Sequence, residues 1–383
     1  MTQPTRITVV GAGFAALTGI RRLRRQLPDA HITLVAPAPE FVYLPSLIWV
    51  PFGLREGEQL RHDLRPVFDS LRVEYRQARA TGVSPDGRTL LTDAGDIDND
   101  ALLIASGGRF LRKLPGIEHS HTLCAGIAAA ETIGARLRAM HQGTIALGFG
   151  GNPQEPSAMR GGPMFELLFG LDTWLRKQGR RDAFRLVFFN PAPQPGKRLG
   201  EKAVKGLLKQ MGERGIETHL GHKLTGFETR RVNTEGGSID ADLILFMPGM
   251  TGPEWIQESP LPKSPGGFVR ADRMCQVENF ERVYVAGDAG SYPGPDWMPK
   301  QAHLADLQAT AAAENIALNL AGKPATRAFR PELVCIVDTL EKGILVYRDE
   351  KRSLLSPPLR PMHWAKRYFE KHYLKGLLDT AGR

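Results

Sequence analysis

The N-terminal segment constrains the fold more than any other part of the chain. Residues 6–10 (RITVV) are apolar enough for a buried strand, and residues 11–16 (GAGFAA) lead from it into an amphipathic helix. A strand that turns through G-x-G-x-x-A into a helix is typical of a dinucleotide site. Gly11 permits the turn, Gly13 lets a pyrophosphate approach the backbone, and Ala16 keeps the helix close to the strand. We therefore predict a dinucleotide-binding fold, with an ordinary strand–helix turn as the alternative.

Strands and helices alternate along the chain, which predicts an α/β fold with parallel sheets covered by helices. The expected strands span residues 6–10, 31–35, 72–75, 101–105, 144–148, 185–189, 242–246 and 282–286. The expected helices span residues 14–26, 59–70, 127–141, 164–179, 200–214, 302–320 and 362–378.

A second glycine turn, GFGG at residues 148–151, follows the fifth expected strand. This predicts two successive nucleotide-type folds, the second inserted in the first. The expected domains are residues 1–108 and 240–325 for the first fold, 109–239 for an inserted Rossmann-like fold with a degenerate nucleotide loop, and 326–383 for a C-terminal segment.

The composition excludes several classes of protein. Hydrophobic residues make up 42% of the 383 residues and charged residues 24%, which is typical of a globular protein with two or three domains. No apolar stretch approaches the roughly 18 residues of a membrane span, and no leader precedes the first strand, so we expect a cytoplasmic protein. Three widely spaced cysteines, Cys124, Cys275 and Cys335, indicate neither a disulfide scaffold nor a metal site.

The formal charge of +9 is concentrated at the C-terminus, where residues 351–383 hold eight Lys or Arg against two acidic residues. Apolar residues recur there at helical intervals together with Trp364 and Tyr368, and Lys366 and Glu370 are among the charged residues between them. That pattern is typical of an amphipathic helix on an anionic bilayer. We therefore predict peripheral attachment to the inner face of the cell membrane and no nucleic-acid binding. A helix packed on its own domain, or a contact in a homo-oligomer, is the alternative.

Several motifs together resemble one family. Residues 100–108 (DALLIASGG) and 281–288 (ERVYVAGD) are similar to FAD-binding elements of flavin disulfide reductases. Four further patches resemble sulfide:quinone oxidoreductases and, more distantly, flavocytochrome c sulfide dehydrogenases and type II NADH dehydrogenases. These patches are residues 41–50 (FVYLPSLIWV), 298–300 (MPK), 333–338 (LVCIVD) and 363–373 (HWAKRYFEKHY). The resemblance implies two nested Rossmann-like domains of the glutathione-reductase kind.

The resemblance also implies FAD as the cofactor and a quinone as the electron acceptor. The implied FAD-binding residues are Gly11, Gly13, Ala16, Ala36, Pro45, Ser106, Gly107, Gly287, Asp288 and Lys300. Asp288 would accept a hydrogen bond from the ribityl chain, and Lys300 would stabilise negative charge on the reduced flavin. Ala36 stands where an acidic residue usually binds the adenosine ribose, and small residues occur there in this family too.

Cys335 resembles the family's catalytic cysteine, which can carry a persulfide, and Lys300 and nearby cations are expected to lower its pKa. A buried, inert cysteine is the alternative. Cys124 matches a further cysteine of the family. The partner of the catalytic cysteine is replaced here by Arg160, which could attract HS⁻, hold the Cys335 thiolate, or indicate a donor other than sulfide. Glu166 would either shuttle protons or cap its helix.

Two observations bear on the electron carriers. Gln301 and Gln308 resemble glutamines that line the quinone site of type II NADH dehydrogenases, although a helix surface also collects glutamines by chance. The second glycine turn argues against NADH, because Pro153 and Pro156 prevent an early helix there. The next strand ends at Asn190 and offers no carboxylate for a ribose.

The sequence therefore predicts a peripheral membrane flavoenzyme that passes two electrons from a small reduced sulfur donor, above all sulfide, to a quinone. One alternative is a type II-like NADH:quinone oxidoreductase. The other is a flavin-binding redox sensor or assembly protein without full turnover.

Overall fold

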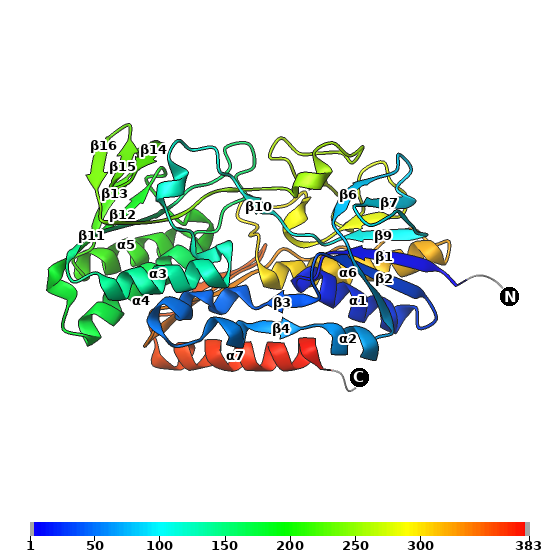
Figure 1. Ribbon diagram of the computed structural model, residues 1–383, viewed down its shortest axis with the longest axis horizontal. Helices are drawn as coiled ribbons and strands as arrows, with labels where there is room; N and C mark the ends of the chain where they lie inside the picture. Colours follow the sequence, from blue (N-terminus) through cyan, green and yellow to red (C-terminus); the bar gives the residue numbers. More distant parts are fainter. Residues whose placement is uncertain (1–3, 380–383) are drawn as a thin grey trace.

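The N-terminal strand forms where the sequence predicts it and organises the first of two parallel sheets. The computed structural model describes residues 4–379. In it, β1 (Arg6–Val10) lies in the middle of a five-stranded parallel sheet with the order β20–β9–β1–β2–β5 (Figure 1). Its partners are β2 (His31–Ala36), β5 (Val73–Gln77), β9 (Ala101–Ile104) and β20 (Val283–Val285). The first half therefore combines four strands from residues 6–104 with one strand from residues 283–285.

The second parallel sheet lies within the interval between β9 and β20. Its order is β13–β12–β11–β17. The strands are β11 (Gly143–Phe149), β12 (Phe184–Asn190), β13 (Glu217–Leu220) and β17 (Leu243–Met247). Since β17 pairs with β11, this sheet extends past the expected domain boundary at residue 239, which is therefore set too early. The predicted α/β fold is confirmed.

Helices cover both sheets, as Figure 1 shows. Their bounds are α1 (Phe14–Gln26), α2 (Arg65–Ser70), α3 (Ile127–Ala139), α4 (Gly162–Lys177), α5 (Glu201–Glu213), α6 (Ala302–Leu320) and α7 (Arg360–Leu378). The expected helix over residues 59–70 is wrong over its first half. There β4 (Arg61–Asp63) pairs with β3 (Glu40–Val42), and Pro66 fits only the first turn of the short α2 that follows.

An antiparallel sheet near the C-terminus was not expected beyond its first strand. It consists of β22 (Leu333–Asp338), β23 (Gly343–Arg348) and β24 (Ser353–Leu355). The remaining described strands are β6 (Ala80–Val83), β7 (Thr89–Thr92), β8 (Ile97–Asp98), β10 (Arg109–Phe110), β14 (Leu224–Glu228), β15 (Arg231–Thr234), β16 (Gly237–Asp240), β18 (Met250–Thr251), β19 (Val269–Arg270) and β21 (Gly290–Ser291). A 3₁₀ helix, Leu44–Phe52, lies buried beside α3 and α4.

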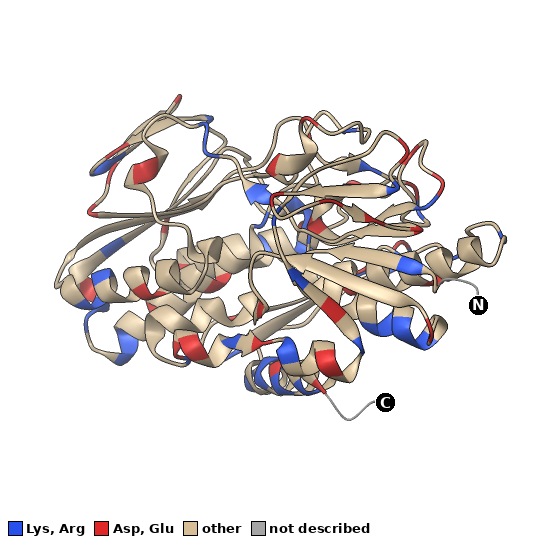
Figure 2. Cartoon of the chain, turned by 45° about the vertical axis from the view of Figure 1, so that its right-hand side comes forward, with Lys and Arg blue, Asp and Glu red and all other residues tan. Residues whose placement is uncertain are grey.

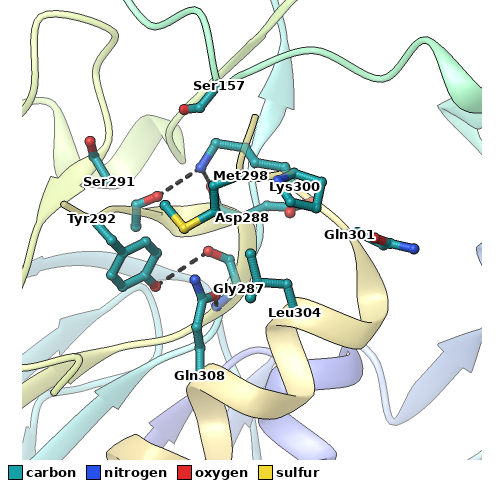
Figure 3. Close-up of a pocket in the computed structure, with 12 residues that line it drawn as sticks. Ser157, Gly287, Asp288, Ser291, Tyr292, Met298, Lys300, Gln301, Leu304 and Gln308 are labelled. Atoms are coloured by element: carbon teal, nitrogen blue, oxygen red, sulfur yellow. Dashed lines mark hydrogen bonds between the residues drawn. The ribbon is translucent and has the colours of Figure 1, made fainter. Parts of the chain in front are cut away.

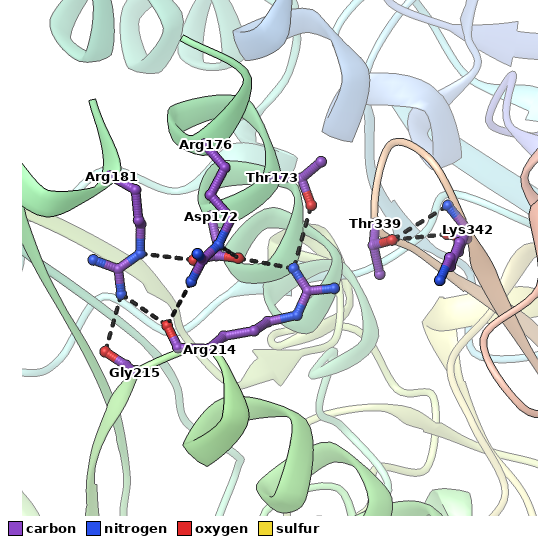
Figure 4. A network of polar contacts seen from close by, with 8 residues as sticks. All are labelled: Asp172, Thr173, Arg176, Arg181, Arg214, Gly215, Thr339 and Lys342. Atoms are coloured by element: carbon purple, nitrogen blue, oxygen red, sulfur yellow. Dashed lines mark hydrogen bonds and ion pairs between the residues drawn. The ribbon is translucent and has the colours of Figure 1, made fainter. Parts of the chain in front are cut away.

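A buried carboxylate ties α4 to its neighbours. Asp172 is fully buried and accepts hydrogen bonds from Arg176 at 3.0 Å, Arg181 at 2.7 Å and Arg214 at 2.8 Å (Figure 4). Burial opposes its ionisation, but the hydrogen bonds from three guanidinium groups outweigh burial, so the pKa of Asp172 is lowered. The cluster joins the C-terminal half of α4 to the end of α5 within the second half.

Candidate functional site

The turn after β1 has the geometry of a phosphate-binding turn. Gly11 has a φ of +111°, and a Cβ there would lie 2.4 Å from the carbonyl oxygen of Ala105. A Cβ at Gly13, by contrast, would meet no heavy atom within 4 Å. No side chain among the described residues caps the first turn of α1. The N–H groups of that turn therefore face open space beside Gly13, which fits a pyrophosphate.

A pocket lies where β20 ends and α6 begins (Figure 3). The ammonium of Lys300 donates to the carbonyl oxygens of Gly290 at 2.7 Å and Asp288 at 3.3 Å. It also lies 3.9 Å from the ring centroid of Phe268. Burial lowers the pKa of Lys300 to about 8. Lys300 thus braces the turn that carries Asp288, and its place at this pocket fits a role beside a flavin.

Arg160, in the loop before α4, contacts one of the residues that line this pocket. Its guanidinium forms an ion pair with the carboxylate of Asp288. The loop is further fixed by Asn152, whose amide donates to the carbonyl oxygen of Met250 at 2.9 Å. The structure therefore places Arg160 against an expected FAD-binding residue, 128 positions away along the chain.

Cys335 lies on β22 and faces the first turn of α4. A Cβ at Gly162 would lie 3.8 Å from its Sγ. Burial, together with the nearby carboxylate of Glu166, raises the pKa of Cys335 to about 12, although Lys366 acts in the opposite direction. The expectation of a lowered pKa is wrong, because removal of the thiol from water outweighs the effect of the one cation that acts on it, Lys366. Lys300 is engaged with backbone carbonyls instead.

Cys124 lies in a short 3₁₀ turn, Leu123–Ala125, beside the same groups. Burial raises its pKa to about 11, with Arg160 lowering it and Glu166 and Asp288 raising it. The two cysteines therefore share Glu166 as an electrostatic neighbour. Both are free thiols, and both are neutral near pH 7.

Glu166 connects this region to the C-terminal helix. Its carboxylate is buried, accepts the backbone N–H of Asp338 at 2.9 Å and forms an ion pair with Lys366. Burial raises its pKa to about 7, and Lys366 opposes that shift. No side chain within residues 4–379 caps the first turn of α4, so the alternative that Glu166 caps its helix is wrong.

The two candidate glutamines, Gln301 just before α6 and Gln308 within it, both line the pocket. Gln308 is buried and accepts the backbone N–H of Gly287 at 2.9 Å. Gln301 donates to the carbonyl oxygen of Val334, next to Cys335, and its own carbonyl oxygen is buried without a partner among the described residues. Gln308 thus has a local structural role, and a role of either residue at a quinone stays a prediction.

The remaining expected FAD-binding residues lie on several elements of the fold. Ala16 lies fully buried in α1, and Ala36 ends β2. Pro45 is the second residue of the 3₁₀ helix Leu44–Phe52, and Ser106 accepts a hydrogen bond from the indole of Trp255 at 3.2 Å. Gly107 has a φ of +73° and open space beside its Cα. The donor set and the open glycine backbones fit FAD.

The second glycine turn does not lead directly into a helix. β11 ends at Phe149 and α4 begins at Gly162, so residues 150–161 intervene as a loop. At the end of β12, the amide of Asn190 donates to the carbonyl oxygen of Phe149 at 2.8 Å. This agrees with the degenerate nucleotide loop that the sequence predicts.

The C-terminal helix is seated through polar side chains, in a way that the sequence pattern did not predict. The inward contacts of α7 are His363 with Asp338 at 2.8 Å, Lys366 with Glu166, Glu370 with Arg55 at 2.9 Å and with Ser46, and Tyr373 with Asp306 at 2.8 Å. The expectation that Lys366 and Glu370 lie on the exposed polar face is therefore wrong. Their ion partners lie on α4 and beside the 3₁₀ helix Leu44–Phe52, far away in sequence. For this reason the local sequence did not indicate that these two side chains face the protein interior.

The outer face of α7 is aromatic and basic. Trp364, Tyr368 and Phe369 are 63%, 70% and 53% exposed. Leu354, Leu355 and Leu359, just before the helix, are exposed as well. Figure 2 shows α7 at the lower edge of the molecule with several Lys and Arg along it. Within residues 4–379, no helix combines the length and apolar character needed to cross a bilayer.

The functional residues that the sequence analysis missed are the partners of α7. They are Ser46, Arg55, Asp306 and Asp338. A helical stripe of polar residues at 363, 366, 370 and 373 was the available signal, since this spacing places them on one face.

Comparison with known proteins agrees with this geometry. Residues 175–309 match the pyridine nucleotide-disulphide oxidoreductase family. The chain is 25% identical to sulfide-quinone reductase of Aquifex aeolicus over 96% of this chain and 90% of that protein. It is 22% identical to a type II NADH:quinone oxidoreductase of Staphylococcus saprophyticus over 83% of each.

Solved structures show the same fold. The sulfide:quinone oxidoreductase of Aquifex aeolicus superposes with a TM-score of 0.89 at 23% identity, covering 99% of this chain and 92% of that one. NDH2 from Plasmodium falciparum superposes with a TM-score of 0.73 at 11% identity, covering 96% and 95%. The predicted fold and the resemblance to sulfide:quinone oxidoreductases are confirmed.

Proposed function

We propose that this chain, a flavoprotein oxidoreductase of the sulfide:quinone oxidoreductase type, passes two electrons from a reduced sulfur donor to a membrane quinone. One observation carries the proposal. Cys335 faces the first turn of α4, close enough to Glu166 for its carboxylate to raise the pKa of the thiol, and Glu166 is bonded to Lys366 on the helix that bears the exposed aromatic face. A thiol, a base and a membrane-facing element are thereby joined in one site.

FAD is the proposed cofactor and supplies two-electron exchange when bound. Gly13 and the first turn of α1 would hold its pyrophosphate, because a Cβ at Gly13 would meet open space and no side chain among the described residues caps that turn. Gly11 shapes the turn, and its N–H donates to the carbonyl oxygen of Val35 at 2.8 Å. Asp288 and Lys300 would bind its ribityl and pyrimidine ends. Arg160 holds the carboxylate of Asp288 in place.

Cys335 is the proposed acceptor of sulfur. Its thiol and HS⁻ would together give a Cys335 persulfide, one proton and two electrons, and a bound FAD would be the oxidant that accepts the two electrons. Because burial keeps the thiol protonated, a base must remove its proton as the sulfur–sulfur bond forms. Glu166 is suited to this task, since its pKa of about 7 leaves a large fraction ionised near neutral pH. Cys124, beside the same carboxylate, is the proposed second thiol of the site.

Quinone reduction is proposed to occur beside α7 at the inner face of the cell membrane. Three exposed aromatic side chains and the exposed Arg360, Lys371 and Lys375 form a surface suited to an anionic bilayer. Gln301, between α6 and β22, is the proposed polar contact of the quinone on the protein side.

Direct oxidation of NADH is the second candidate, and the second glycine turn speaks against it. The loop of residues 150–161 separates β11 from α4, so a pyrophosphate there would lack an adjacent helix N-terminus. The similarity to a type II NADH:quinone oxidoreductase nevertheless makes the test worthwhile. Mixing the flavin-loaded protein with NADH anaerobically should leave the flavin oxidised, and rapid bleaching would favour this candidate.

The proposal is tested by sulfide-dependent reduction of decylubiquinone. Cys335→Ser should lose at least 100-fold in rate, because the acceptor of sulfur is gone. Cys275→Ser is the matched control, since Cys275 is a buried free thiol outside β22 and α4, which hold Cys335 and Glu166, and the variant should keep near-normal turnover. Turnover without change in Cys335→Ser would contradict the role of Cys335. No turnover with any quinone in the wild type would favour a sensor or assembly protein.

A further inference from the structure

A second cavity lies outside the site described above, between α5 and the sheet β22–β24. Its volume is about 240 Å³. The lining side chains are Leu199, Ala203, Gly206, Leu207, Gln210, Val337, Ile344, Val346, Leu355, Ser356, Pro357 and Pro358. An apolar cavity of about 150 Å³ in another protein stays dry and binds benzene. This larger apolar cavity therefore suits an apolar ligand.

The polar groups of the lining argue against a polar ligand. The hydroxyl of Ser356 already accepts the N–H of Leu345 at 2.9 Å and donates to the carbonyl oxygen of Pro357 at 2.9 Å. Gln210 is the other polar side chain in the lining. A ligand inside would thus find almost entirely hydrocarbon, with Val337 and Val346 forming the inner wall beside Cys335.

The cavity reaches the surface beside the exposed apolar face of the C-terminal segment. Leu355, Pro357 and Pro358 line it and are also exposed. Leu355 is flanked by Leu354, which is 60% exposed, and the same segment continues through Leu359 into α7. The entrance is therefore continuous with the surface proposed to contact the membrane.

Basic side chains flank the cavity on α5. Lys202, Lys205 and Lys209 are exposed and recur at a spacing that places them on one stripe of the helix. The lysine stripe lies next to the stripe of α5 residues that line the cavity, on the side that faces solvent. The cations are complementary to the phosphate of an anionic lipid, and the apolar cavity is complementary to its hydrocarbon chain.

We propose that this cavity holds the end of an acyl chain of an anionic phospholipid, drawn from the membrane that α7 contacts. The proposal rests on the membrane contact described under the proposed function. The lipid would fix the sheet β22–β24, and with it Cys335, to the bilayer surface.

A glycine offers a direct way to fill the cavity. Gly206 lines it in the middle of α5, and a Cβ there would meet no heavy atom within 4 Å. Gly206→Leu should place a side chain inside the space. Gly212→Leu is the matched control, because Gly212 lies on the same helix, is exposed, and also has no heavy atom within 4 Å of a Cβ.

The experiment uses full-length, flavin-loaded protein on vesicles of phosphatidylglycerol and phosphatidylcholine. The phosphatidylglycerol carries a diazirine near the methyl end of one acyl chain, and labelled peptides are mapped after illumination. Wild type and Gly212→Leu should be labelled within residues 199–210 and 337–358. In Gly206→Leu, the labelling of these residues should fall at least tenfold. The variant should still sediment with the vesicles as the wild type does. Gly206→Met serves if the leucine variant has a lowered melting temperature.

Other outcomes overturn the proposal. Equal labelling of Gly206→Leu, or labelling confined to the aromatic face of α7, excludes a lipid in the cavity while the membrane contact stands. Displacement of the label by ubiquinone but not by unlabelled phosphatidylglycerol identifies a quinone tail instead. If the wild type neither pellets nor is labelled, the membrane contact fails as well. Lys205→Gln should weaken labelling by phosphatidylglycerol about fivefold, and an unchanged yield contradicts the role of the basic stripe.

Discussion

Glu166 of α4 and Lys366 of α7 form a buried ion pair across 200 positions of the chain. The same carboxylate accepts the backbone N–H of Asp338 on the strand of Cys335. The helix that is proposed to lie on the membrane is thus bonded directly to the base proposed to serve the reactive thiol. A change in the position of α7 should therefore change the rate of the reaction at Cys335.

The pH dependence of turnover should follow Glu166. As a base, Glu166 works when ionised, so the rate at constant HS⁻ concentration should rise with pH through about 7 and then level off. Glu166→Gln should lose roughly 100-fold in rate and this pH step. Lys366→Met should move the step to higher pH, because the ammonium lowers the pKa of Glu166. An identical pH profile in all three proteins would exclude Glu166 as the base.

Stability should also depend on pH through Asp306. Its carboxyl, buried beside Thr18 and Tyr373, has a pKa raised by burial to about 6. The folded state therefore binds more protons than the unfolded state between about pH 4 and 6, and stability falls as pH rises through that window. The loss amounts to about 3 kcal/mol for a shift of this size. Urea unfolding at several pH values should show it in the wild type and not in Asp306→Asn. If the unfolding free energy of the variant falls with pH as steeply as that of the wild type, the effect belongs to another group.

Membrane binding should reside in the outer face of α7. Replacing Trp364, Tyr368 and Phe369 together by serine should weaken partitioning into anionic vesicles by roughly tenfold or more, because their exposed rings no longer enter the interface. The melting temperature and the flavin absorbance should not change, since these side chains point away from the fold. Deleting the whole helix is a poorer test, because Asp338 and Glu166 would lose their partners. Normal pelleting of the triple variant would refute the membrane role of this face.

The cluster around Asp172 should dominate the stability of the second half. Asp172→Asn leaves three guanidinium groups without their counter-charge, and we expect a loss of about 3–5 kcal/mol in unfolding free energy. Glu341→Gln is the control, because its ion pair with Lys177 is about half exposed and should contribute less than about 1 kcal/mol. Similar losses of unfolding free energy in both variants would mean that the buried cluster contributes no more than an exposed ion pair.

Local patterns made most of the fold predictable. The turn at Gly11 and Gly13 is a short-range motif, and α1 and α6 begin and end where their periodicity indicates. The orientation of α7 was not predictable in the same way, because Lys366 and Glu370 find partners 200 and 315 positions away. Charged residues on a helix indicate an exposed face unless a buried partner is known.

The chemistry of the site was predictable only in outline. The residue types at positions 335, 166 and 300 suggested a thiol, an acid and a cation near FAD. The state of Cys335 depends on its burial, which opposes the expected effect of nearby cations. The domain boundary was likewise not predictable, because it depends on the pairing of β17 with β11. Pairing between strands that are distant in sequence leaves no signal in the local sequence.

The account is tested most directly by following the blue absorbance band of the bound flavin after anaerobic mixing with sodium sulfide. We predict bleaching within seconds in the wild type, recovery of the band on adding decylubiquinone, and no bleaching in Cys335→Ser. A flavin that stays oxidised in sulfide would contradict the assigned donor. A flavin that bleaches equally in Cys335→Ser would contradict the route through this thiol.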